Sequence, residues 1–95
     1  MRESAGRREL RALIESVEHG EKPVSDLLDW FDHYEVWKGP QEGPRGGRSR
    51  FRTVYRVSVT HYKPFLMGQA YYLPSLNEAI LTVAHQALEY KLKGE

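Results

Sequence analysis

The sequence predicts an α+β domain in which one three-stranded antiparallel sheet is covered by helices on one face. Three observations predict this class. A strongly alternating segment occupies residues 51–60, and a second strand-like segment follows it after a short Pro-containing turn. Helical apolar spacing occurs only before and after these strands. One layer of helices on one sheet is the simplest packing that buries all of these apolar faces.

Length and composition limit the function classes. The chain has 95 residues, enough for one domain, and 40% hydrophobic with 28% charged residues is typical of a globular protein. No apolar run is long enough to cross a membrane, and the first twenty residues lack the apolar core of a signal peptide. The absence of cysteine excludes disulfides, cysteine-zinc sites and thiol catalysis. We therefore expect an intracellular protein of the cytoplasm or nucleus.

The first helix is predicted over residues 7–19. Its apolar residues recur at the i, i+3, i+4 and i+7 spacing of one helix face, and they are Leu10, Leu13, Ile14 and Val17. Gly20 is a natural stop. We expect residues 1–21 to form an N-terminal helical extension and residues 22–95 to form the main domain.

The next elements are read from turn residues and alternation. Pro23 in a first turn predicts a second helix that ends near residue 33. Residues 34–38 are aromatic and β-branched and predict a strand, and the Gly-rich stretch 39–49 predicts a loop. The strand at 51–60 then turns through residues 61–64 into a third strand at 65–73.

The last helix begins with a capping signal. Ser75 is a good N-cap, and Glu78 three residues later completes a capping box. Its expected buried side consists of small and apolar residues, namely Ala79, Val83, Ala84, Ala87 and Leu88.

From residue 22 onward the chain resembles the double-stranded RNA-binding domain (dsRBD), whose layout is α-β-β-β-α. The resemblance rests on the helix start at Pro23, the Gly43-Pro44 pair in the first hairpin loop, and Gly68 and Ala70 in the third strand. In the last helix the alanine and leucine positions of the family pattern match, at Ala79, Ala84, Ala87 and Leu88. The resemblance implies a dsRBD-like fold with an additional N-terminal helix.

The family's phosphate-binding residues are missing. Three lysines at the start of the last helix bind the major-groove phosphates in the family, and here those positions hold Leu76, Asn77 and Ile80. Loss of three phosphate contacts weakens binding by orders of magnitude at physiological salt. The second helix carries acidic residues that would repel phosphate, namely Asp26, Asp29 and Asp32. Binding of double-stranded RNA is therefore expected to be weak or lost.

An apolar pair stands in place of those lysines. Leu76 and Ile80 lie one helical turn apart and are expected to form an exposed patch. Either the N-terminal helix of the same chain, a second copy or another protein could cover it. The predicted protein-interaction residues are Leu76, Ile80, Leu10, Leu13, Ile14 and Val17.

Basic residues favour the alternative function. Residues 43–63 contain six basic and no acidic side chains, whereas residues 15–35 contain seven acidic and one basic. Segregated charge of this kind steers charged partners. The candidate RNA-binding residues are Arg45, Arg48 and Arg50 in the loop and Arg52 and Arg56 on the following strand.

The predicted function is a non-catalytic module for protein–protein association, including dimerisation, and the resemblance implies an RNA-processing or RNA-silencing assembly. The alternatives are duplex-RNA binding through residues 45–56 and an unrelated small α+β interaction or inhibitor protein. No enzyme activity, cofactor or small-molecule substrate is expected. A metal site is not expected either, because the four histidines lack metal-ligand spacing. Four aromatic residues could stack on bases, but packing within the fold is their usual role; they are Trp30, Trp37, Tyr71 and Tyr72.

Overall fold

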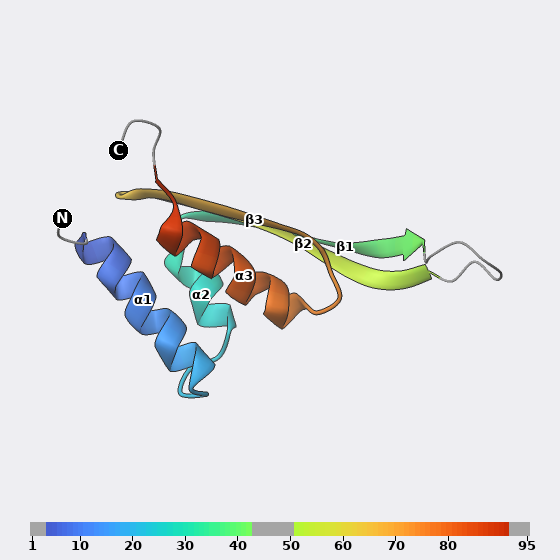
Figure 1. The fold of residues 1–95 in the computed structure, drawn as a ribbon, viewed down its shortest axis with the longest axis horizontal. Helices are drawn as coiled ribbons and strands as arrows, with labels where there is room; N and C mark the ends of the chain where they lie inside the picture. The colour runs from blue at the N-terminus through green and yellow to red at the C-terminus, as the bar shows by residue number, and fades with distance from the viewer. Residues whose placement is uncertain (1–3, 43–50, 92–95) are drawn as a thin grey trace.

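The computed structural model describes residues 4–42 and 51–91. The elements in order are α1 (Ala5–Glu18), α2 (Ser25–Trp30), β1 (His33–Glu42), β2 (Phe51–Tyr62), β3 (Phe65–Leu73) and α3 (Leu76–Glu89). The strands form one antiparallel sheet in the order β1-β2-β3, and the helices lie on one side of it (Figure 1). The predicted α+β class is thereby confirmed. Among the described helices, none is long and apolar enough to cross a membrane.

Helix α1 forms where its apolar spacing predicts it. The Ser4 hydroxyl caps the helix by accepting a hydrogen bond from the Arg7 backbone N–H at 3.2 Å. Beyond its C-terminal end, Gly20 adopts a φ of 77°, a left-handed conformation that glycine tolerates without strain. The predicted helix and its stop are both confirmed, and the helix begins two residues earlier than expected.

Helix α2 has only six residues and is shorter than the predicted 23–33. The backbone becomes extended at Phe31, which is buried in the core, so the helix cannot continue. The next residue already joins the sheet, because the Asp32 N–H donates to the Thr60 carbonyl at 3.0 Å. Tertiary packing of Phe31 therefore overrides the local helical pattern.

Strand β1 runs to residue 42, so the prediction of a loop from residue 39 is wrong for residues 39–42. Gly39 pairs with Val54, and Pro40 pairs with Thr53. Proline is tolerated here because β1 is an edge strand, where one row of backbone N–H groups has no ladder partner. The Trp37 ring occupies the space that a Cβ on residue 39 would need, so the ring covers the glycine. The predicted loop residues 43–49 lie outside the described part of the chain.

Strands β2 and β3 match their predicted positions, with β2 extended to Tyr62. Their register contains a bulge: Val57 pairs with Ala70, but Tyr55 pairs with Leu73. Arg56 of β2 therefore faces two β3 residues, Tyr71 and Tyr72. This arrangement is a β-bulge, which bends a strand and redirects side chains.

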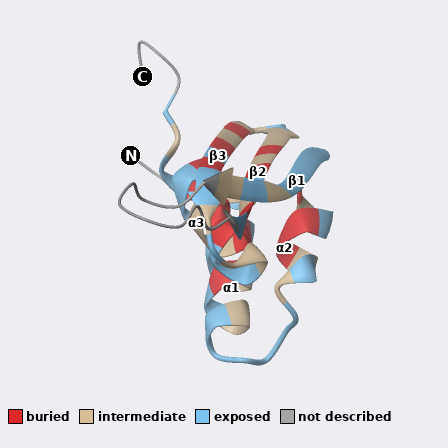
Figure 2. Cartoon of the chain, turned by 90° about the vertical axis from the view of Figure 1, so that its right-hand side faces the viewer, coloured by how far each residue is buried: buried red, intermediate tan, exposed pale blue. Residues whose placement is uncertain are grey.

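The core lies between the sheet and α3, where red buried segments face one another in Figure 2. The predicted buried side of α3 is confirmed, and Leu10 and Ile14 of α1 belong to the same core. Helix α3 approaches β3 so closely at Gly68 that a Cβ there would meet the backbone oxygen of Val83. Residues 1–21, expected as an extension, thus contribute two core side chains to the unit formed by the rest of the chain.

Candidate functional site

The N-terminal end of α3 does not present the expected apolar patch. Ile80 is 3% exposed and belongs to the core, whereas Leu76 is half-buried and packs against it. The prediction of an exposed Leu76–Ile80 pair is therefore wrong. Its physical reason is the packing of the whole domain: Ile80 belongs to one apolar cluster formed by residues of all three helices and of the sheet.

The apolar side of α1 is likewise used inside the chain. Leu10 and Ile14 are buried, and Leu13 and Val17 are half-buried against the core. The sequence allowed three partners for these apolar residues: the same chain, a second copy or another protein. The structure shows packing within the same chain. Leu10 and Ile14 are thus not accessible to a protein partner, which corrects the expectation for these two residues, whereas Leu13 and Val17 keep part of their surface exposed.

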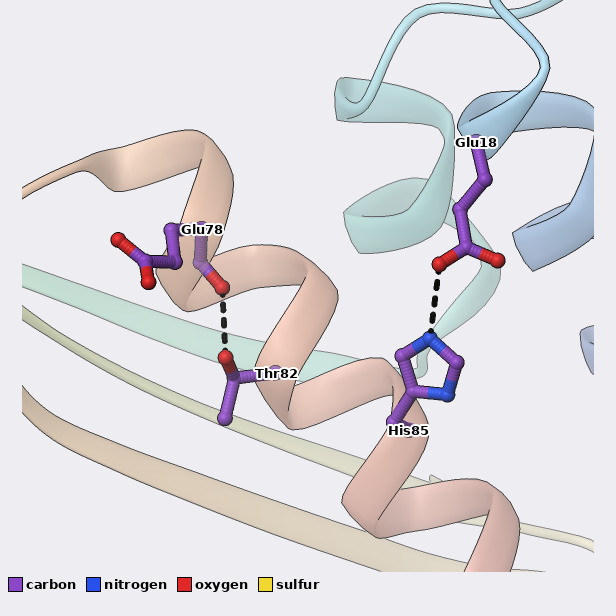
Figure 3. A network of polar contacts seen from close by, with 4 residues as sticks. All are labelled: Glu18, Glu78, Thr82 and His85. Carbon is purple, nitrogen blue, oxygen red and sulfur yellow. Dashed lines mark hydrogen bonds and ion pairs between the residues drawn. The ribbon is translucent and has the colours of Figure 1, made fainter.

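Polar contacts hold α1 against α3 at both ends. The Arg7 guanidinium donates hydrogen bonds to the backbone oxygens of Leu88 and Tyr90. Toward the other end of α1, Glu18 lies 3.1 Å from the imidazole of His85 (Figure 3). Figure 3 also shows Thr82, whose hydroxyl donates to the Glu78 carbonyl at 2.8 Å within α3. Helix α1 is therefore fixed by specific contacts as well as by apolar packing.

Two of the five predicted RNA-binding arginines lie in the described part of the chain. Arg52 and Arg56 are exposed on β2. The Arg56 guanidinium carbon lies 5.3 Å from the centre of the Trp37 ring, a cation–π contact across two strands. The three loop residues Arg45, Arg48 and Arg50 lie outside the described residues.

A cavity of about 490 Å³ is lined by residues of all three strands, and the alternation of those strands places it on the sheet face away from the buried Val57 and Val59. Six side chains with the strand alternation of that face line it: Glu35, Trp37, Arg56, Ser58, Gln69 and Tyr71. Trp37 on β1 and Tyr71 on β3 flank Arg56 on the central strand. The Tyr71 hydroxyl donates to Gln69 Oε1 at 2.7 Å. We call this surface the helix-free face.

The bulge in β3 sets the position of the tyrosines. Tyr72 has a φ of 58°, a left-handed conformation that is strained for an aromatic residue. Tyr71 and Tyr72 are each about half exposed, and their ring centres lie 6.2 Å apart. The bulge therefore leaves two adjacent aromatic rings in contact with solvent.

The two edges of the sheet differ. On β3, the Gln69 backbone N–H donates to Gln86 Oε1 at 2.8 Å, so a side chain of α3 occupies part of that edge. On β1, three large apolar side chains within four positions are 40–46% exposed: Tyr34, Val36 and Trp37. An exposed apolar edge strand is a site for pairing with another chain.

The remaining polar candidates have structural roles. The His61 ring stacks on Trp30 at 4.0 Å between centres, and its Nδ1 lies 2.9 Å from the Pro64 carbonyl. Asp32 accepts a hydrogen bond from the Tyr62 backbone N–H at 2.8 Å. Within residues 4–42 and 51–91, no group of three or more His, Asp or Glu side chains lies close enough to hold a metal ion.

Sequence reasoning found the arginines of this surface but not its aromatic residues. The sequence pattern predicts packing within the fold for Trp37 and Tyr71, and the alternation of residues 65–73 does not indicate a bulge. One sequence feature does indicate the exposed tryptophan: Gly39 follows Trp37 by two residues on the same side of the strand and leaves room for its ring. No protein-family model, no curated protein and no solved structure matches the chain.

Proposed function

We propose that this chain is a non-catalytic module that associates with a second copy of itself through strand β1. The observation that carries the proposal is the exposure of Tyr34, Val36 and Trp37 on an edge strand. Edge strands carry a row of backbone N–H and C=O groups free to pair with another strand. Apolar side chains beside those groups add a favourable burial term when a second strand covers them.

The composition of β1 places the pairing in its first half. Lys38 and Pro40 occupy the half nearer the hairpin loop, and charged residues and proline both oppose edge pairing. The segment from Tyr34 to Trp37 contains neither lysine nor proline, and Glu35 is its one charged residue. Five or so paired residues are a small interface, so we expect a weak, concentration-dependent dimer.

A second copy of β1 is a better partner for this segment than an unrelated strand, because the side chains of two antiparallel copies of β1 complement each other. Antiparallel pairing with the two-fold axis at Val36 sets Tyr34 opposite Lys38 of the second copy and Glu35 opposite Trp37. Because Arg56 lies over the Trp37 ring, each Glu35 then approaches a cationic group of the other copy. Moving the axis to Glu35 would instead set two carboxylates opposite each other, which is destabilising.

We also propose that the domain is a divergent member of the dsRBD family, and hence that it acts in an RNA-processing or RNA-silencing assembly. Three observations support this: the order of the elements from α2 to α3, the close contact at Gly68, and the burial of the matching alanines in α3. Duplex-RNA binding gains little support from the described residues, since the expected phosphate-binding helix end carries Glu78 and α2 carries Asp26.

The test is the molar mass in solution as a function of protein concentration, by sedimentation or light scattering. The parent protein should approach twice its chain mass as concentration rises. Val36→Lys and Val36→Glu should each stay monomeric, because each sets like charges opposite each other at the axis. An equimolar mixture of the two variants should regain dimers.

The matched control is Tyr62→Lys, which changes an exposed aromatic residue at the end of β2, outside the strand that is proposed to pair. It should dimerise as the parent does. A parent that stays monomeric at all concentrations, or variants of Val36 that dimerise unchanged, would overturn the proposal.

A further inference from the structure

We propose that the helix-free face binds single-stranded nucleic acid, with Trp37 and Tyr71 stacking on bases and Arg56 binding phosphate. This function is separate from the pairing of β1 edges. Edge pairing extends the sheet in its own plane, so it leaves Tyr71 on β3 open, whereas Trp37 and Arg56 are shared by the two proposed functions.

The arrangement of rings and charge is the first support. Trp37, Arg56 and Tyr71 come from three neighbouring strands and line one cavity. Both rings are 40–51% exposed, so their flat surfaces are accessible to a ligand. Aromatic rings on a sheet bind unpaired bases by stacking, and arginine beside them adds cation–π and phosphate contacts.

The strained bulge is the second support. A left-handed tyrosine costs free energy, and such strain tends to persist where it serves a site. Here the bulge lies directly beside the cavity: Tyr71 lines the cavity, and the centre of the Tyr72 ring lies 6.2 Å from the centre of the Tyr71 ring.

Charge and polarity favour nucleic acid over a protein as the occupant. Arg52 and Arg56 lie on the same face of β2, two alternations apart, and both are exposed. The other lining side chains of this face are polar: Ser58 and Gln69 can exchange hydrogen bonds with base edges, and Glu35 is the one acidic side chain among them. A protein partner would find little apolar area beyond the rings themselves.

The single-stranded form follows from what the rings require. Bases in a duplex are stacked on one another and cannot meet a protein ring, and A-form duplexes are recognised by their shape and backbone. A single strand exposes the base faces while its phosphates remain within reach of the arginines. Stacking tolerates any base, so we expect little sequence preference.

Fluorescence anisotropy with labelled oligouridylate and oligothymidylate of about 12 nucleotides tests the proposal. The parent protein should bind both more tightly at about 50 mM salt than at 200 mM. Trp37→Ala and Tyr71→Ala should each weaken binding roughly tenfold or more. Arg56→Gln should weaken binding and lower the salt dependence of the logarithm of affinity by about 0.7 for the lost phosphate contact.

A conservative variant locates the base. Trp37→Phe keeps a ring and should retain binding. In that variant Trp30 is the remaining tryptophan, so the quenching of tryptophan emission that oligouridylate causes in the parent should disappear. Because Trp30 stacks on His61, it is not available to the ligand in this way.

Tyr62→Ala is the matched control, because it removes an equally exposed tyrosine outside the cavity. It should bind like the parent, and circular dichroism checks that every variant is folded. The proposal is overturned if the parent binds neither oligonucleotide at low salt, or if Tyr62→Ala weakens binding as much as Tyr71→Ala. Tighter binding of an RNA duplex than of the single strands would also overturn it.

Discussion

The backbone oxygen of Val83 in α3 lies against the position that a side chain on Gly68 of β3 would occupy. This contact sets the distance between the final helix and the sheet. Since the obstructing atom is backbone, no side-chain rotation can make room for a larger residue. The small residue expected at this position from the dsRBD pattern thus has a direct steric reason.

Gly68→Ala should therefore lower the free energy of unfolding by about 1–3 kcal/mol, the usual cost of overpacking a core. Equilibrium urea unfolding measures it. Asn77→Ala, an exposed change in α3, is the control and should stay within about 0.5 kcal/mol of the parent. Equal stability of Gly68→Ala and the parent would show that α3 does not pack this closely.

Ile80→Ala should destabilise the protein by about 2–5 kcal/mol, because it removes a core side chain and leaves a cavity. Leu76→Ala, one turn earlier and only half-buried, should cost clearly less. The midpoints of thermal and urea unfolding compare the two variants directly. Similar small losses for both would contradict the burial of Ile80 in the core.

Arg7→Ala should destabilise the protein by about 1.5 kcal/mol, since it removes charged hydrogen bonds to two carbonyl groups at the end of α3. It should also speed proteolytic cleavage within α1, which loses one of its attachments. Arg8→Ala alters an exposed neighbour and serves as the comparison. If both variants unfold alike, the contacts of Arg7 contribute nothing measurable.

Local sequence patterns predicted the elements well where those patterns also describe the packing. The spacing of Leu10 and Ile14 predicted α1, and the alternation around Val57 predicted β2, because a period reports directly which side is buried. The alanines of α3 identified its buried side for the same reason. These features depend on one element at a time.

The predictions fail at residues whose conformation or burial depends on contacts between two elements. Gly39 and Pro40 are loop residues by composition, but pairing with β2 and the Trp37 ring hold them in a strand. The family pattern, with lysine at the position of Ile80, predicts an exposed residue, but here Ile80 joins a core formed by several elements together. The bulge at Tyr72 depends on how β3 meets β2, which no local period reveals.

The hydrogen bond from Gln69 to Gln86 has a consequence for aggregation. It occupies one backbone N–H of the β3 edge with a side chain of the same molecule, whereas the β1 edge exposes apolar side chains. A subunit that pairs through one sheet edge alone stops at a dimer, because no second edge is left for another copy. We therefore expect this contact to disfavour the growth of fibres, and we expect Gln86→Ala to weaken that protection.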